Sequence, residues 1–151
     1  MVKPKRVGHL VLNVKDVEAS TKFYTEIMGF DISVKRPDGS GTFFTCGKIH
    51  HDLAVFKAPE GAAPVSPGGV GLNHFAVQLE DFNALKEFYQ HLKARGVKAD
   101  RTVDHHMTKS IYFHDPDGNG IEVFCNTHDD PAEGLAEMRR PGRKNAVLVL
   151  D

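Results

Sequence analysis

The 151-residue chain has few cysteines, almost no net charge and no long apolar run. Its two cysteines, Cys46 and Cys125, are too few for a disulfide framework, which favours buried free thiols in a reducing compartment. A formal net charge of −1 gives no electrostatic footprint for nucleic acid or an anionic membrane. No apolar stretch approaches the roughly 20 residues of a spanning helix, and no signal peptide follows MVKPKR. These absences predict a cytoplasmic protein that binds neither nucleic acid nor membrane.

Histidine is the residue that stands out, with nine in the chain, and one stretch near the C-terminal end combines several reactive side chains. Here a turn sequence, DPDGNG, joins two strand-like runs. In the second run Ile121, Val123 and Cys125 alternate with Glu122, so Glu122 points to the opposite face. A carboxylate in a mostly apolar strand is costly to bury unless it is paired or bound to a metal. Glu122 is therefore a candidate ligand. The two strand-like runs are 110–113 and 121–125.

An internal repeat organises the rest of the chain. HLVLNVKDVEASTKFY, which begins at His9, aligns without gaps on HFAVQLEDFNALKEFY, which begins at His74. In each copy a strand-like run is followed by an aspartate, Asp16 or Asp81, that can cap a helix. Three further strand-like runs follow the first helix, and the last of them contains LAVF, which matches IEVF near the end of the second copy. The sequence therefore predicts one βαβββ unit used twice.

The predicted fold class is α+β, with two βαβββ modules paired into a cup-like curved sheet and helices outside. We expect a single domain over residues 1–127, with modules at about 5–57 and 71–126. A linker rich in Pro, Gly and Ala covers 58–70, and a C-terminal tail covers 128–151.

Strand alternation places three side chains that can bind a metal on the opposite face of each strand from its apolar residues. These are His9 and His74, at equivalent places in the repeat, and Glu122. Ala54 occupies the position equivalent to Glu122. The fourth of these repeat-related positions therefore carries no metal-ligating side chain. Two histidines and one carboxylate with open positions are typical of a non-haem iron centre. The competing interpretation is that a histidine on a strand is a satisfied core or edge residue.

The doubled βαβββ unit resembles the vicinal oxygen chelate superfamily, which holds glyoxalases, bleomycin-resistance proteins, fosfomycin-modifying transferases and type I extradiol dioxygenases. The sequence VDH, then five residues, then IYFHDPDGNGIE, is similar to the extradiol dioxygenase signature. The resemblance covers roughly residues 5–127 and implies a one-domain enzyme that cleaves a catechol-type diol with O2. It implies His9, His74 and Glu122 as ligands of Fe(II), with Mn(II) as an alternative metal.

The same resemblance implies three catalytic residues that do not bind the metal. His105 and Tyr112 match the signature residues that hydrogen-bond substrate and intermediates. The segment KIHHDLA is similar to the one that carries the acid–base histidine, and its position before Asp52 favours His51, with His50 as the alternative. The remaining histidines are interpreted as surface or turn residues: His91, His106, His114 and His128.

Other functions of the same fold remain alternatives. A glyoxalase-type isomerase requires a fourth ligand, which Ala54 cannot supply. A fosfomycin-type transferase also uses two histidines and a glutamate, but has no evident use for His51 or the signature around Tyr112. A binding or resistance module would lack the metal triad. Val11 stands where some members carry a polar residue, so the sequence does not identify which catechol is the substrate. The sequence also leaves open whether the chain forms a homodimer.

Overall fold

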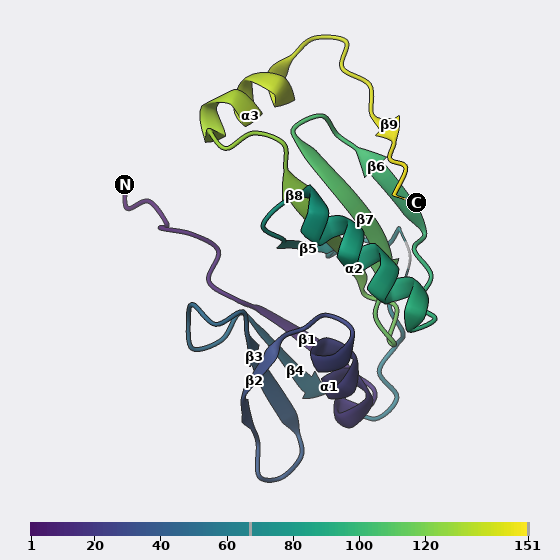
Figure 1. Ribbon diagram of the computed structural model, residues 1–151. Helices are drawn as coiled ribbons and strands as arrows, with labels where there is room; N and C mark the ends of the chain where they lie inside the picture. Colours follow the sequence, from purple (N-terminus) through teal and green to yellow (C-terminus); the bar gives the residue numbers. More distant parts are fainter. Residues whose placement is uncertain (67, 151) are drawn as a thin grey trace. The chain divides into compact units, whose positions relative to one another are not determined.

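The computed structural model describes residues 1–66 and 68–150, which form two compact units, Met1–Val65 and Ser66–Asp151. Pro67 of the predicted linker and Asp151 at the end of the predicted tail lie outside the described residues. Each unit contains one mixed β-sheet with a helix packed on one of its faces (Figure 1). The predicted α+β architecture of two βαβββ modules is confirmed.

The first unit has a four-stranded sheet of order β1-β4-β3-β2. Strands β1 and β4 run parallel, whereas β4–β3 and β3–β2 are antiparallel. The parallel pair requires a crossover, which the helix and the β2–β3 hairpin provide. The elements are β1 (Leu10–Val14), α1 (Val17–Glu26), β2 (Asp31–Lys35), β3 (Gly41–Thr45) and β4 (Leu53–Lys57).

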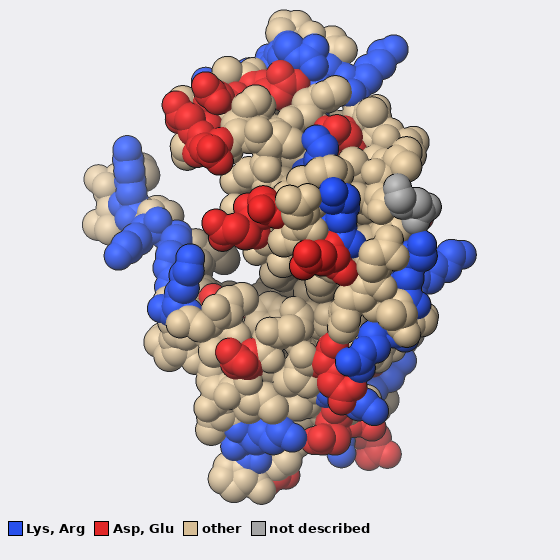
Figure 2. Space-filling view, in the orientation of Figure 1, with Lys and Arg blue, Asp and Glu red and all other residues tan. Residues whose placement is uncertain are grey.

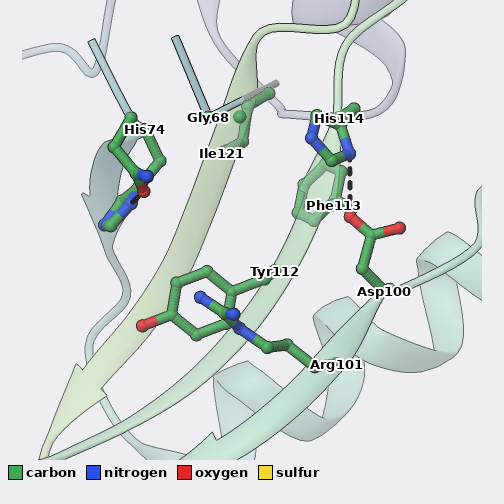
Figure 3. Close-up of a pocket in the computed structure, with 10 residues that line it drawn as sticks. Gly68, His74, Asp100, Arg101, Tyr112, Phe113, His114 and Ile121 are labelled. Carbon is green, nitrogen blue, oxygen red and sulfur yellow. Dashed lines mark hydrogen bonds and ion pairs between the residues drawn. The ribbon is translucent and has the colours of Figure 1, made fainter. Parts of the chain in front are cut away.

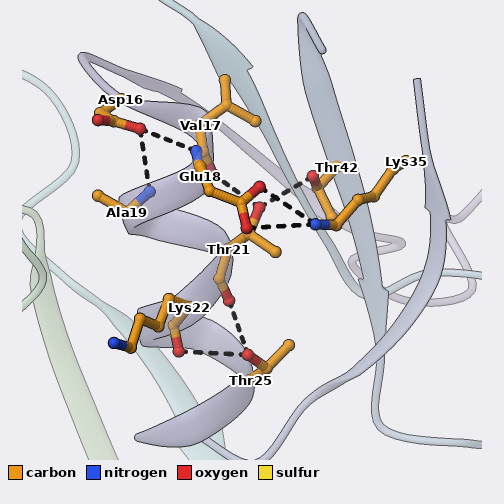
Figure 4. A network of polar contacts seen from close by, with 9 residues as sticks. All are labelled: Asp16, Val17, Glu18, Ala19, Thr21, Lys22, Thr25, Lys35 and Thr42. Carbon is orange, nitrogen blue, oxygen red and sulfur yellow. Dashed lines mark hydrogen bonds and ion pairs between the residues drawn. The ribbon is translucent and has the colours of Figure 1, made fainter. Parts of the chain in front are cut away.

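Helix α1 begins at Asp16, as the sequence predicted, and is tied to the sheet by polar and aromatic contacts. The Asp16 carboxylate accepts hydrogen bonds from the backbone N–H groups of Glu18 and Ala19 at 2.9 and 3.0 Å. One turn further on, the Thr21 hydroxyl lies 2.9 Å from that of Thr42 on β3 (Figure 4). The fully buried Tyr24 packs against aromatic side chains of the sheet, so α1 covers its apolar face.

The second unit repeats this arrangement and extends it. Its five-stranded sheet has the order β5-β8-β7-β6-β9, with β5 parallel to β8 and the other pairs antiparallel. The C-terminal segment contributes a helix and a short strand that pairs with β6 (Figure 1). The elements are β5 (Phe75–Gln78), α2 (Phe82–Ala94), β6 (Arg101–Asp104), β7 (Thr108–His114), β8 (Gly120–Asn126), α3 (Pro131–Arg139) and β9 (Ala146–Val147).

Burial along β8 confirms the alternation predicted from the sequence. Ile121, Val123 and Cys125 are fully buried against the side of the sheet that α2 covers. Glu122 lies on the other side with 13% of its side chain exposed. Strands β7 and β8 are longer than the runs 110–113 and 121–125 because the hairpin pairs in register from Thr108↔Asn126 to His114↔Gly120.

The described residues contain no helix with the length and apolar character needed to cross a membrane. On the face drawn in Figure 2, acidic and basic side chains are interspersed, in keeping with a formal net charge of −1. This mixed surface offers no broad field of one sign for a polyanion.

Candidate functional site

A row of paired residues crosses the open face of the second sheet. Ala76 of β5 pairs with Glu122 of β8, Glu122 with Tyr112 of β7, and Tyr112 with Arg101 of β6. Directly paired residues project to the same face, so three polar side chains stand side by side. The equivalent row of the first sheet is apolar throughout, and consists of Val11, Ala54, Phe43 and Val34. The repeat therefore carries its polar cluster in one copy.

Glu122 is the centre of this cluster. Its Oε1 accepts hydrogen bonds from the Ser110 hydroxyl at 2.6 Å and the Tyr112 hydroxyl at 2.8 Å. Its Oε2 lies 3.0 Å from Nε2 of His74. Hydrogen bonds to a carboxylate are among the stronger ones in proteins, so these three contacts fix the position of the Glu122 side chain.

The turn between β7 and β8 and the glycine that follows it explain how the sequence brings Glu122 and His74 together. Asp115 closes the β7–β8 hairpin by accepting hydrogen bonds from the backbone and side-chain amides of Asn119, both at 2.8 Å. The following Gly120 lies against the residues just before β5, where an added Cβ would stand 2.6 Å from the Asn73 carbonyl oxygen. Only glycine allows this approach, which brings β8 beside His74.

The hydrogen bonds of His74 orient its ring towards the carboxylate. Its Nδ1 lies 2.7 Å from Oδ1 of Asn73, an oxygen that can accept a hydrogen bond from the Nδ1–H group. In that tautomer Nε2 is the nitrogen free to bind a cation, and it is the one that faces Oε2 of Glu122. Metal-bound histidines characteristically donate their other ring N–H to an oxygen in this way.

The residues present fit a divalent metal ion as two of its ligands. Two ligands side by side on one ion at about 2.1 Å lie roughly 3 Å apart. The separation of 3.0 Å between His74 Nε2 and Glu122 Oε2 matches that value. Imidazole and carboxylate together suit iron and manganese. No third His, Cys, Asp or Glu completes a metal-binding group within the described part of this unit.

Tyr112 and His105 form the other half of the cluster. Nε2 of His105 lies 2.8 Å from the Tyr112 hydroxyl, which itself donates to Glu122. Burial, and then the neighbouring Glu122 carboxylate, raise the pKa of Tyr112 to about 12. The phenol therefore stays protonated at neutral pH and acts as a hydrogen-bond donor. The structure thus brings together four of the predicted site residues: His74, His105, Tyr112 and Glu122.

The C-terminal segment holds the loop that carries His105. Arg143 donates a hydrogen bond to the His105 carbonyl oxygen at 2.7 Å. Nε2 of His106 donates to the Lys144 carbonyl oxygen at 2.8 Å, and β9 pairs with the end of β6. His106 has a positive φ of 69°, which a non-glycine residue adopts only when its surroundings hold it there. These contacts make the tail part of the site's support.

Replacing Arg143 with alanine is expected to lower the free energy of unfolding by about 1–2 kcal/mol, because the loop loses a charge-assisted hydrogen bond. Chemical denaturation measures this difference. Arg143→Lys keeps a charged donor and serves as the matched variant, with a smaller loss expected. Equal stability of all three proteins would show that the tail does not hold the His105 loop.

In the first unit, two of the predicted residues lie together. The rings of His9 and His51 have centroids 4.4 Å apart, and His51 also contacts Phe43 of β3. His51 is half-buried whereas the adjacent His50 is exposed, and the Nδ1 atoms of these two histidines face each other. Partial burial, followed by the nearby His50 and His9, lowers the pKa of His51 and favours its neutral form. A neutral imidazole can accept a proton.

A pocket of about 300 Å³ opens beside the second-unit cluster. Figure 3 shows the Arg101 guanidinium lying across the Tyr112 ring, and Asp100 paired with His114 at 2.8 Å. The sequence analysis missed Arg101, Ser110 and Asn73. Ser110 stands two residues before Tyr112 on one strand, and this spacing could have placed it on the same face. The pocket is lined by Gly68, Asn73, His74, Asp100, Arg101, Tyr112, Phe113, His114, Gly120 and Ile121.

Residues 6–123 match the family model described as "Glyoxalase/Bleomycin resistance protein/Dioxygenase superfamily". Among curated proteins, the chain is 30% identical over 142 residues to biphenyl-2,3-diol 1,2-dioxygenase 2 of Rhodococcus globerulus, covering 93% of this chain and 73% of the relative. It is 30% identical over 135 residues to an iron-dependent extradiol dioxygenase of Rhodococcus jostii, covering 79% of this chain and 42% of the relative. It is also 30% identical over 128 residues to the metallothiol transferase FosB of Staphylococcus haemolyticus, covering 83% and 87%.

Solved structures show the same fold. A glyoxalase/dioxygenase from Nostoc punctiforme matches with a TM-score of 0.72 at 23% identity, covering 85% of this chain and 97% of that chain. This likeness concerns the fold alone. The curated relatives include both dioxygenases and a transferase, so the choice between these activities depends on the site.

Proposed function

This chain belongs to the glyoxalase/bleomycin resistance protein/dioxygenase superfamily, and we propose that it is an extradiol dioxygenase. The reaction adds both atoms of O2 to a catechol-type aromatic diol and opens the ring next to the two hydroxyls. The observation that carries the proposal is the Glu122 cluster, in which one carboxylate faces His74 and also accepts from Tyr112, itself hydrogen-bonded to His105. Relatives named as biphenyl-2,3-diol dioxygenase and iron-dependent extradiol dioxygenase support the same reaction.

The proposed metal ligands are His74 and Glu122 of the second unit and His9 of the first. Fe(II) is the proposed metal and Mn(II) the alternative, since both accept imidazole and carboxylate ligands. When bound, the metal supplies a centre on which the diol and O2 are held next to each other. The sequence repeat supports His9 as the third ligand, because His9 and His74 occupy equivalent places directly before β1 and β5.

The remaining residues would orient the diol and move its protons. The single O–H of Tyr112, which donates to Glu122 in this structure, would turn to a substrate oxygen when the diol binds, and His105 keeps that hydroxyl in place. His51 accepts a proton from a diol hydroxyl and returns it as the ring opens, which for a positioned base contributes about 10²–10⁴-fold to the rate. The half-buried position of His51 beside His9 supports it over the exposed His50.

Two rival activities have less support from the residues of the site. A glyoxalase-type isomerase needs a fourth ligand, and the equivalent of Glu122 in the first unit is the fully buried Ala54, between Val11 and Phe43. A thiol transferase would also use two histidines and a glutamate as metal ligands. It gives no role to the hydrogen-bonded pair Tyr112 and His105.

The proposal is tested by anaerobic reconstitution with Fe(II), followed by mixing with O2 and a panel of aromatic diols. The expected result is O2 uptake with a coloured ring-fission product for at least one diol. Parallel assays with a hemithioacetal of glutathione and with fosfomycin plus a thiol address the rivals. Turnover in either of those assays, without O2 uptake on any diol, would overturn the proposal in favour of isomerase or transferase.

Replacing Tyr112 with phenylalanine is expected to keep the metal but weaken both diol affinity and turnover by roughly 10- to 100-fold, the range for a lost hydrogen bond to a charged group. Ser110 still donates to Glu122 in this variant, so the carboxylate keeps one of its partners. Metal content and anaerobic diol titration measure the two effects separately. An unchanged diol affinity would show that the Tyr112 hydroxyl does not contact the substrate.

A further inference from the structure

Arg101 is a charged side chain of the pocket that the proposed reaction leaves without a role. It stands on β6 directly opposite Tyr112 of β7, on the face that carries Glu122. Its guanidinium carbon lies 4.3 Å from the centroid of the Tyr112 ring (Figure 3). The planar guanidinium is therefore stacked on the phenol that would bind the substrate oxygen. Stacking of this kind limits the orientations of an otherwise flexible arginine.

The donors of Arg101 are not used by the protein. Among residues 1–66 and 68–150, the side chain of Arg101 makes no hydrogen bond or ion pair and contacts the ring of Tyr112. The carboxylate nearest in sequence, Asp100, is already paired with His114 at 2.8 Å. A guanidinium carries five N–H donors in a rigid fork that matches the two oxygens of a carboxylate. Here that fork faces a pocket of about 300 Å³.

The first unit shows that the sheet itself does not require a cation at this place. The residue equivalent to Arg101, across from Phe43 as Arg101 is from Tyr112, is Val34. Both copies of the module fold, so the arginine is not needed to pair β6 with β7. Asn73, His74, His114 and Arg101 give the pocket a polar lining, which suits a charged substituent better than a second apolar ring.

We propose that Arg101 binds the carboxylate of an aromatic diol that carries one, so that the preferred substrate class is the carboxylated catechols. This inference rests on the proposed function, since it assumes that the diol oxygens lie at Tyr112 and Glu122. The proposal places the carboxylate substituent of that diol against the guanidinium that lies over the Tyr112 ring. Arg101 acts as a specificity residue and takes no part in the oxygen chemistry.

The test compares ligands that differ only in charge. Dihydroxybenzoates with 2,3- and 3,4-hydroxyls and the corresponding carboxamides are titrated anaerobically by calorimetry into the Fe(II)-loaded protein. At least one carboxylate is expected to bind roughly 10- to 100-fold more tightly than its amide. Arg101→Gln should remove that preference, and Arg101→Lys should retain part of it because it keeps the charge but not the fork. Arg139→Gln, an exposed arginine of α3, is the matched control and should bind as the parent does.

Two results would overturn the inference: equal affinity of the parent for each acid and its amide, or an unchanged preference in Arg101→Gln. O2 uptake with the neutral carboxamides separates this question from the proposed function. Cleavage of the amides without any preference for the acids leaves the dioxygenase proposal intact and rejects the role of Arg101. A preference that depends on Arg101, without cleavage of any diol, supports the carboxylate site and rejects the dioxygenase.

Discussion

Glu122→Gln is expected to lose metal binding and ring cleavage while keeping the fold. An amide of nearly the same shape can still accept from Ser110 and Tyr112, so the β7–β8 pair should remain ordered. The amide carries no charge for a cation shared with His74. Changes to the groups around a metal ligand already cost roughly 10- to 100-fold in affinity or activity, so loss of the ligand itself should exceed about 100-fold.

Metal content after dialysis against Fe(II), together with the thermal midpoint, measures this prediction. Glu87→Gln, on the exposed side of α2, makes the same chemical change away from the cluster and should match the parent in both measurements. Full metal occupancy in Glu122→Gln would show that Glu122 is not a ligand. If Glu122→Gln does not fold, Glu122→Asp replaces it in the test, because aspartate keeps the charge and shortens the side chain.

His51→Gln is expected to slow turnover by about 10²–10⁴-fold, the usual contribution of a positioned acid–base residue. The variant should keep its metal and bind the diol anaerobically, since His51 lies beside His9 and is not itself a proposed ligand. The expected defect is therefore in the steps that follow the arrival of O2. Single-turnover reaction of the preformed diol complex with O2 measures it directly.

Two further variants serve as comparisons for His51→Gln. His128→Gln, on the loop before α3, removes a histidine that pairs with Glu133 and is not a proposed site residue, and it should react at the parent rate. His50→Gln tests the neighbouring alternative and should lose much less than His51→Gln, because His50 is exposed. If both His50→Gln and His51→Gln react like the parent, the acid–base role assigned to this segment is wrong.

The sequence predicted those parts of the fold that local patterns or the repeat encode. Asp16 and Asp81 do cap α1 and α2, because a cap depends on residues only two or three positions away. Alternation along β8 placed Glu122 on the open face, since the side-chain period of a strand is fixed. The repeat predicted that Ala54 and Glu122 occupy equivalent places, and in the structure they pair alike with Val11 and Ala76 in the two parallel strand pairs.

Contacts between distant segments could not be read in the same way. The stack of Arg101 on Tyr112 depends on the register of β6 against β7, which an irregular loop between them sets. The hydrogen bond from Arg143 to the His105 carbonyl oxygen joins the tail to a loop far along the chain. No short spacing in the sequence marks either contact, so the tail had no predicted role, although it supports the site.

The most direct measurement of the central claim is turnover under ¹⁸O2 with mass spectrometry of the product. The dioxygenase account predicts a ring-opened product whose mass equals that of the diol plus O2, with label in its new carboxylate and cleavage beside the two hydroxyls. The Glu122→Gln protein, treated with Fe(II) in the same way, should form none of it. A product without label, or a ring opened between the two hydroxyls, would contradict the account.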